Sequence, residues 1–143
     1  MFYFSAVDLQ ITNIHVIAES DIEGTQIAVF DFDDSCYHFF VHDIAVAITQ
    51  MRKSALEASF CGLKQSAEEE EKRFLDVYLN RRGLDEAQEQ QLRQWLPRFV
   101  RYRAALIVCW ASEERRTGGL TGPAAVAWFS KSLPLYQAML DNF

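Results

Sequence analysis

The chain is poor in the residues that build disulfide scaffolds and metal clusters. Its 143 residues include 3 cysteines, 3 histidines, 3 prolines and 6 glycines. The cysteines, Cys36, Cys61 and Cys109, are odd in number and far apart, so they match neither a zinc-ligand spacing nor a disulfide framework. We therefore expect reduced thiols and a cytoplasmic protein.

Positive charge and long apolar runs are also scarce. The chain carries 14 Lys and Arg against 20 Asp and Glu, a formal net charge of −6. Proteins that bind nucleic acid depend on clustered Lys and Arg, so we expect no nucleic-acid partner. No apolar run approaches the roughly 20 residues that a membrane-spanning helix needs, so we expect no membrane partner either.

Half of the residues are hydrophobic, which at this length predicts a single domain, residues 1–143, with a substantial core. The β-branched and aromatic runs Ile14–Ile17 and Gln26–Phe30, with Gly24 between them, predict a β-hairpin. After it, apolar residues recur at intervals of three and four, which predicts helices. The expected fold is α+β and mostly α-helical, a β-hairpin followed by about five helices.

The predicted helices cover residues 40–57, 68–83, 85–95, 97–115 and 123–140. The near-continuous apolar run from Phe39 to Ile48 indicates that the first of them is buried on most sides. Asp85 and Gln88 have the spacing of a capping box at a helix start. Pro97 either kinks its segment or begins a new helix in its first turn.

Carboxylates gather where the second strand of the hairpin ends. Val29 and Phe30 run directly into Asp31, followed by Asp33 and Asp34, and upstream Asp8 and Asn13 lie five positions apart. Divalent cations such as magnesium take oxygen ligands, and phosphotransferases hold them with an Asn and a later Asp while another Asp receives the substrate proton. Because the hairpin returns the chain, we expect Asp31 to lie beside Asn13.

Three segments resemble a known family. AVFDFDDS at residues 28–35 and VHDIAVA at residues 41–47 are similar to the signature of the aminoglycoside phosphotransferase and choline kinase-like superfamily, in particular its type II homoserine kinase-like group. VDLQITN at residues 7–13 resembles that family's catalytic loop. The resemblance covers about the first fifty residues, and it implies the fold of the C-terminal lobe of a protein-kinase-like enzyme.

The resemblance also implies roles for individual residues. Asp8 would be the catalytic base, and Asn13 and Asp31 would bind Mg²⁺ and, through it, ATP. Asp33 and Asp34 would lie close to the metal, with Asp33 as a further ligand, or would face the acceptor site. Asp43 would be a structural carboxylate that accepts hydrogen bonds from the catalytic-loop backbone.

The function implied is a Mg²⁺- and ATP-dependent phosphotransferase that acts on a hydroxyl of a small-molecule acceptor. The chain would be its C-terminal lobe, with the N-terminal nucleotide lobe absent. The chain departs from the family's loop at Ala6 and Gln10, where the family has His. Ala6 and the missing nucleotide lobe favour an alternative. In it the lobe is catalytically inactive and serves as a binding or oligomerisation module, with a homodimer formed through apolar surface such as Phe2–Phe4. A small carboxylate metal protein unrelated to kinases is a third interpretation.

Other residues have two interpretations. His38 and His42 could share a helix face as metal ligands, although no third ligand supports them and structural histidines fit as well. Glu113 and Glu114 could line a pocket for a cationic acceptor or simply end a solvated helix. The tryptophans lie in apolar stripes and are expected in the core: Trp95, Trp110 and Trp128.

Overall fold

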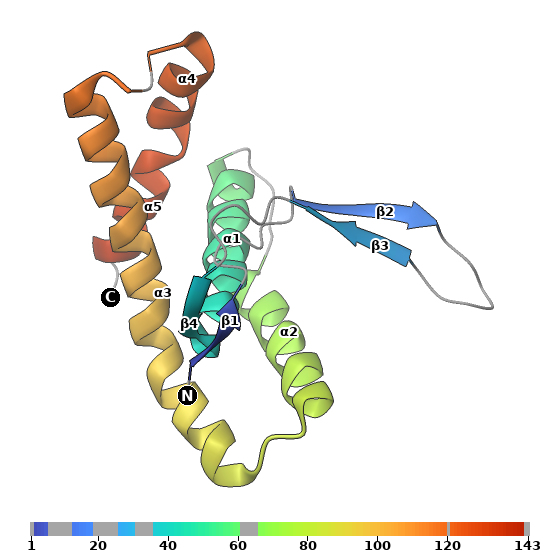
Figure 1. Ribbon diagram of the computed structural model, residues 1–143. Coiled ribbons are helices and arrows are strands. Elements are labelled where there is room, and N and C mark those ends of the chain that lie inside the picture. Colours follow the sequence, from blue (N-terminus) through green and yellow to red (C-terminus); the bar gives the residue numbers. More distant parts are fainter. Residues whose placement is uncertain are drawn as a thin grey trace.

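The computed structural model describes residues 2–5, 13–18, 26–30, 36–60, 66–119 and 121–141. Over these ranges the chain forms four short strands and then five helices (Figure 1). In order they are β1 (Phe2–Ser5), β2 (Ile14–Ala18), β3 (Gln26–Val29), β4 (Cys36–Phe39), α1 (Phe40–Phe60), α2 (Ala67–Arg82), α3 (Glu86–Thr117), α4 (Pro123–Lys131) and α5 (Leu133–Asp141).

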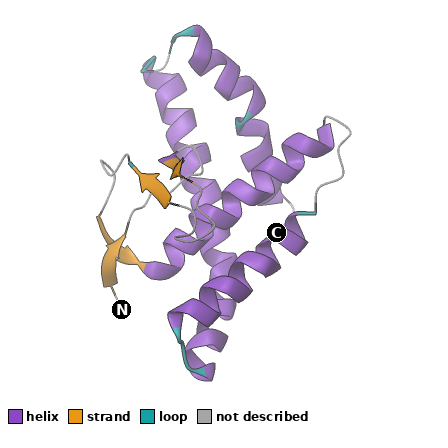
Figure 2. Ribbon diagram, turned by 90° about the vertical axis from the view of Figure 1, so that its right-hand side faces the viewer, coloured by secondary structure: helices purple, strands orange, loops and turns teal. Residues whose placement is uncertain are grey.

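The strands form two antiparallel pairs, one nested inside the other along the chain. β2 pairs with β3, which confirms the predicted hairpin, and β1 pairs with β4, which the sequence patterns did not predict. Figure 2 shows the strands gathered on one side of the helices. The mostly helical α+β class is therefore confirmed, with one more strand pair than expected.

α1 is the most deeply buried element that the structure describes. Ile44, Ala45, Val46 and Ile48 are each at most 1% exposed. α1 packs against α2, α3, α5 and both strands of the β1–β4 pair, so its apolar residues have neighbours on most sides. The buried helix predicted from the run Phe39–Ile48 is confirmed.

α2 is attached to α1 by an ion pair. Nε and Nη2 of Arg52 in α1 donate to the two carboxylate oxygens of Glu71 in α2 at 2.6 and 2.9 Å. This bidentate contact raises the pKa of Arg52 against the opposing effect of its burial. Ser66 caps the start of α2, because its hydroxyl accepts from the Glu69 N–H. As predicted, the helix ends at Gly83, the C-cap, which adopts the left-handed conformation with φ 63°.

α3 begins with the predicted capping box. Oδ1 of Asp85 accepts from the Gln88 N–H at 2.8 Å, and Oε1 of Gln88 accepts from the Asp85 N–H at 3.1 Å. The helix then continues through Pro97 to Thr117, so the alternative in which a new helix begins at Pro97 is wrong. Burial of Leu96 and Val100 on either side of the proline holds the helix together where one backbone hydrogen bond is missing.

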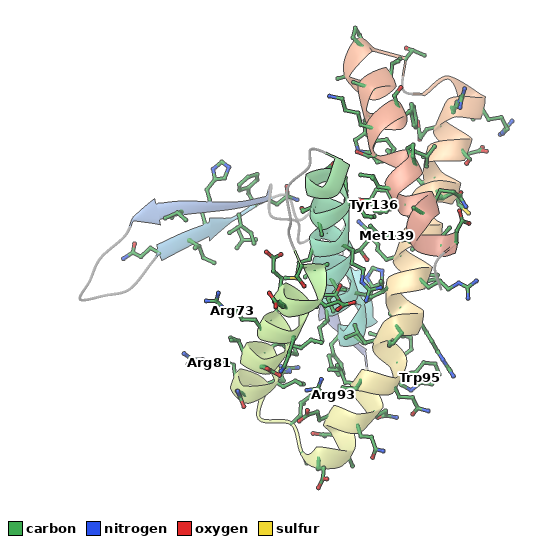
Figure 3. All side chains as sticks on the ribbon, turned by 180° about the vertical axis from the view of Figure 1, so that it is seen from behind. Arg73, Arg81, Arg93, Trp95, Tyr136 and Met139 are labelled. Atoms are coloured by element: carbon green, nitrogen blue, oxygen red, sulfur yellow. The ribbon has the colours of Figure 1, made fainter. Side chains whose placement is uncertain are left out.

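The last predicted helix is divided in two. α4 ends at Lys131 and α5 begins at Leu133, with the buried Ser132 between them. α5 forms a second apolar cluster with α3, in which Tyr136 and Met139 pack around Ala104 (Figure 3). Among the described residues, no helix is long and apolar enough to cross a membrane.

The capping box of α3 gives a stability prediction. Replacing Asp85 with Ala leaves the Gln88 N–H without its side-chain partner and should lower the free energy of unfolding by about 1 kcal/mol, measured by urea denaturation. Glu86→Ala is the matched control, because it removes a carboxylate one residue later and keeps both capping bonds. Equal losses in the two variants would show that the cap contributes nothing beyond charge at the helix start.

Candidate functional site

The β2–β3 hairpin brings Asn13 and Phe30 together at its open end. Ile14 pairs with Val29, and one residue outward the Phe30 N–H donates to the Asn13 carbonyl oxygen at 3.1 Å. Asn13 is only 7% exposed. Phe30, which directly precedes Asp31, is therefore hydrogen-bonded to Asn13, which the sequence predicts to be a metal ligand.

The β1–β4 pair closes the other side of the same region. Ser5 pairs with Cys36, so the chain leaves one strand and enters the other at neighbouring points. Two segments, residues 6–12 and 31–35, each connect the Ser5–Cys36 pair to the Asn13–Phe30 contact. We use the name strand frame for the Ser5–Cys36 pair together with the Asn13–Phe30 contact.

The strand frame bounds most of the predicted site. Asp8 belongs to the first connecting segment, and Asp31 and Asp33 belong to the second; all three lie outside the described residues. Asn13 is described and forms part of the frame itself. The expectation that Asp31 lies beside Asn13 stays a prediction. What is observed is the hydrogen bond between Phe30, the residue before Asp31, and Asn13.

Asp43 lies in the first turn of α1 and is half-buried. α1 begins directly after β4, so this carboxylate lies four residues beyond the end of the strand that pairs Cys36 with Ser5. A carboxylate at this position also complements the partial positive charge of the helix N-terminus. Its predicted hydrogen bonds to the catalytic-loop backbone stay a prediction.

The two histidines considered as metal ligands do not share a helix. His38 belongs to β4 and His42 to α1, so the helical pair is wrong. The ring of His42 is 1% exposed and lies edge-on to Tyr102 and Phe99, with centroids 6.0 and 6.4 Å away. Within the part of the chain that the structure describes, no three His, Cys, Asp or Glu side chains gather closely enough to hold a metal.

Glu113 is an exposed side chain near the end of α3. Its carboxylate accepts two hydrogen bonds from Arg116, from Nη2 at 2.6 Å and from Nε at 2.8 Å. This contact lowers the pKa of the exposed Glu113. Of the two interpretations of this acidic pair, the structure favours the solvated helix end for Glu113.

Apolar side chains of the hairpin are exposed, which the sequence patterns did not reveal. Val16, Ile17, Ile27 and Phe30 are 42–66% exposed. The hairpin projects from the helices on the side of α1 away from α3 (Figures 1 and 3). It therefore presents apolar surface immediately next to the strand frame.

A pocket of about 480 Å³ lies where α1 begins, between the end of α2 and the first half of α3. Its walls are largely apolar, with Arg82 and Gln88 among the few polar groups; four of the lining residues are aromatic, Phe39, Phe40, Trp95 and Phe99. Phe39 is three residues beyond Cys36 along β4, a strand length of about 10 Å. The pocket is thus at the far end of β4 from the strand frame.

We compared the chain with protein-family models, curated proteins and solved structures. No family model, curated protein or solved structure matches this chain.

The exposed hairpin gives a prediction about local stability. A two-stranded hairpin is marginally stable without further packing, whereas the β1–β4 pair packs on α1. The amides of β2 and β3 should therefore exchange with solvent roughly tenfold faster, or more, than those of β1 and β4, measured by hydrogen exchange. Equal protection of the two strand pairs would contradict this reading of the fold.

Proposed function

We propose that this chain is the C-terminal lobe of a Mg²⁺- and ATP-dependent phosphotransferase that acts on a small-molecule hydroxyl. The family proposed is the aminoglycoside phosphotransferase and choline kinase-like superfamily. One observation carries the proposal. The strand frame ties together the two segments that bear Asp8, Asp31 and Asp33, and Asn13 is part of it.

Chain connectivity strengthens this assignment. Asp31 is bonded to Phe30, so its Cα lies about 3.8 Å from that of Phe30, which is itself held against Asn13. Asp8 is three residues from Ser5, a reach of at most about 11 Å. By these limits the proposed base would lie near the Ser5–Cys36 pair, and Asp31 would lie beside the Asn13–Phe30 contact.

The donor set suits magnesium. Asn13 would contribute an amide oxygen and Asp31 and Asp33 carboxylate oxygens, the ligand types that hard divalent cations prefer. A bound Mg²⁺ would neutralise charge on the transferring phosphoryl group. Asp8 would accept the proton of the acceptor hydroxyl, and Asp43 would support the region from the start of α1.

The exposed apolar residues of the hairpin support a nucleotide at this position. Val16 and Ile27 face each other across the strands and are both more than half exposed. A nucleobase is a flat, largely apolar ligand that stacks on such surfaces, while its phosphates would extend toward Asn13. The exposed, unpaired thiol of Cys109 fits the reducing cytoplasm, where ATP and magnesium are available.

The second candidate function is an inactive kinase-like lobe that acts as a binding module. Ala6 and Gln10 favour it, because both replace side chains of the family's catalytic loop. The two functions differ in a measurable way. The first requires the chain to bind a metal–nucleotide complex, and the second does not.

Calorimetric titration of the chain with ATP at saturating Mg²⁺ tests the proposal. We expect binding that depends on Mg²⁺ and that weakens at least about tenfold, or about 1.4 kcal/mol, in Asp31→Ala and in Asn13→Ala. Asp141→Ala is the matched control, because it removes an exposed carboxylate at the last residue of α5 and should leave the affinity unchanged.

Two results would count against the metal–nucleotide site. Binding that is equal in all variants would place the nucleotide elsewhere. No binding by a chain whose circular dichroism shows it folded would favour the inactive module.

A further inference from the structure

The pocket at the start of α1 has a floor that belongs to the core of the protein. Val41 and Leu92 line it and are only 6 and 3% exposed, and both are members of the apolar cluster that joins α1, α2 and α3. α1 packs against both of the other helices (Figure 1). Side chains of a close-packed core keep fixed rotamers, so the floor of the pocket has its shape before any ligand binds.

Two exposed aromatic residues form the rim of the pocket. Phe39 and Trp95 line it and are 39 and 42% exposed, so the expectation that Trp95 lies in the core is wrong. The ring of Phe39 lies edge-on to that of Phe99, with centroids 5.8 Å apart, and this contact fixes one part of the wall. The volume of about 480 Å³ is within the range of sites that bind small molecules, roughly 300–1,000 Å³.

A single positive charge lines this largely apolar pocket. Among the described residues of its wall, Arg82 alone is ionisable. Cζ of Arg82 lies 6.0 Å from the centre of the Phe40 ring, and Phe40 also lines the pocket, so the guanidinium is held at the wall. A guanidinium has five N–H donors, so it can keep its contacts within the chain and still donate to a ligand.

Gln88 adds donors of the same kind to the pocket wall. Its Oε1 accepts from the Asp85 N–H at 3.1 Å in the capping box of α3, so the group that it offers to a ligand is chiefly its amide NH₂. The same bond fixes the orientation of the side chain. The pocket therefore combines apolar walls with N–H donors, and its complement is a molecule with an apolar body and a negatively charged acceptor.

We propose that this pocket binds a small aromatic carboxylate, with its ring among the aromatic side chains and its carboxylate on Arg82. Aromatic rings pack favourably edge-to-face or offset against other rings, and four of the lining residues are aromatic. A guanidinium matches a carboxylate with two parallel hydrogen bonds. One negative charge balances the one positive charge, whereas a phosphate group carries roughly 1.5 to 2 negative charges and would leave charge uncompensated against apolar walls.

The inference does not rest on the proposed function. The pocket lies at the far end of β4 from the strand frame, and its described wall residues come from β4, the three helices and the connection between α2 and α3. The aromatic carboxylate should therefore bind without Mg²⁺ and without a nucleotide. An experiment that omits both gives an answer that does not depend on whether the chain binds ATP.

Calorimetric titration of the full chain with 2-naphthoate tests the proposal, and 2-naphthamide is the matched probe, because it keeps the rings and replaces the carboxylate with a neutral amide. We expect 2-naphthoate to bind at least about tenfold more tightly than 2-naphthamide, and Arg82→Gln to remove this preference.

Arg81→Gln is the control variant, because Arg81 is the exposed neighbour of Arg82 in the last turn of α2 and is not among the residues that line the pocket (Figure 3). Its preference for 2-naphthoate should equal that of the parent chain. Three results overturn the proposal: no binding of 2-naphthoate up to about 10 mM by a folded chain, equal affinity for the two probes, or equal losses in the two variants.

The three tryptophans report where the probe binds. Trp95 lines the pocket, whereas Trp110, which is 47% exposed and not in the core as expected, lies edge-on to Trp128 of α4, with centroids 5.5 Å apart. Each indole N–H gives its own nuclear magnetic resonance signal, and Trp95→Phe identifies the one from Trp95. Addition of 2-naphthoate should shift the Trp95 signal and leave the other two in place. Shifts of the Trp110 and Trp128 signals as large as that of Trp95 would place the ligand elsewhere and overturn the proposal.

Discussion

Burial of α1 is the constraint on which the rest of the structure depends. Its apolar residues have helices and strands on most sides, and Ile44 and Ala45 are almost wholly shielded from solvent. Because β4 runs into α1 without an intervening loop, fixing the helix also fixes the strand. β4 in turn holds β1 through the Ser5–Cys36 pair, and this pair is one half of the strand frame. The helical core and the candidate site are therefore joined through the junction between Phe39 and Phe40.

The strand frame suggests how a site could be assembled from residues on two separate segments of the chain. Carboxylates that converge on one cation repel each other, so their backbones have to be held by something other than their own interactions. In the proposed site this role would fall to backbone hydrogen bonds, those from Phe30 to Asn13 and between β1 and β4. In the proposed phosphotransferase the residues of the site would be positioned by the strands, and the metal would supply the charge that makes their approach favourable.

Local patterns in the sequence predicted much of the fold, but they did not predict contacts between residues far apart in the chain. The capping box at Asp85 and the end of α2 at Gly83 depend on neighbouring residues, and both were predicted. The pairing of β1 with β4 joins four-residue strands more than thirty positions apart, and no single short turn connects them. Periodicity placed Trp95 and Trp110 on apolar stripes and therefore in the core, but it cannot tell whether another element covers a stripe. In the candidate site, the sequence predicted the donors and the hairpin, whereas the frame required the structure.

The central claim is that a divalent cation with its nucleotide binds at the open end of the hairpin. Manganese in place of magnesium tests this most directly, because it is paramagnetic and broadens the nuclear magnetic resonance signals of nearby residues. With ATP present, the account predicts broadening of the amide signals of Asn13 and Phe30 and no effect on α4. Broadening centred on the acidic start of α2, Glu68 to Glu71, or broadening spread evenly over the chain, would contradict it.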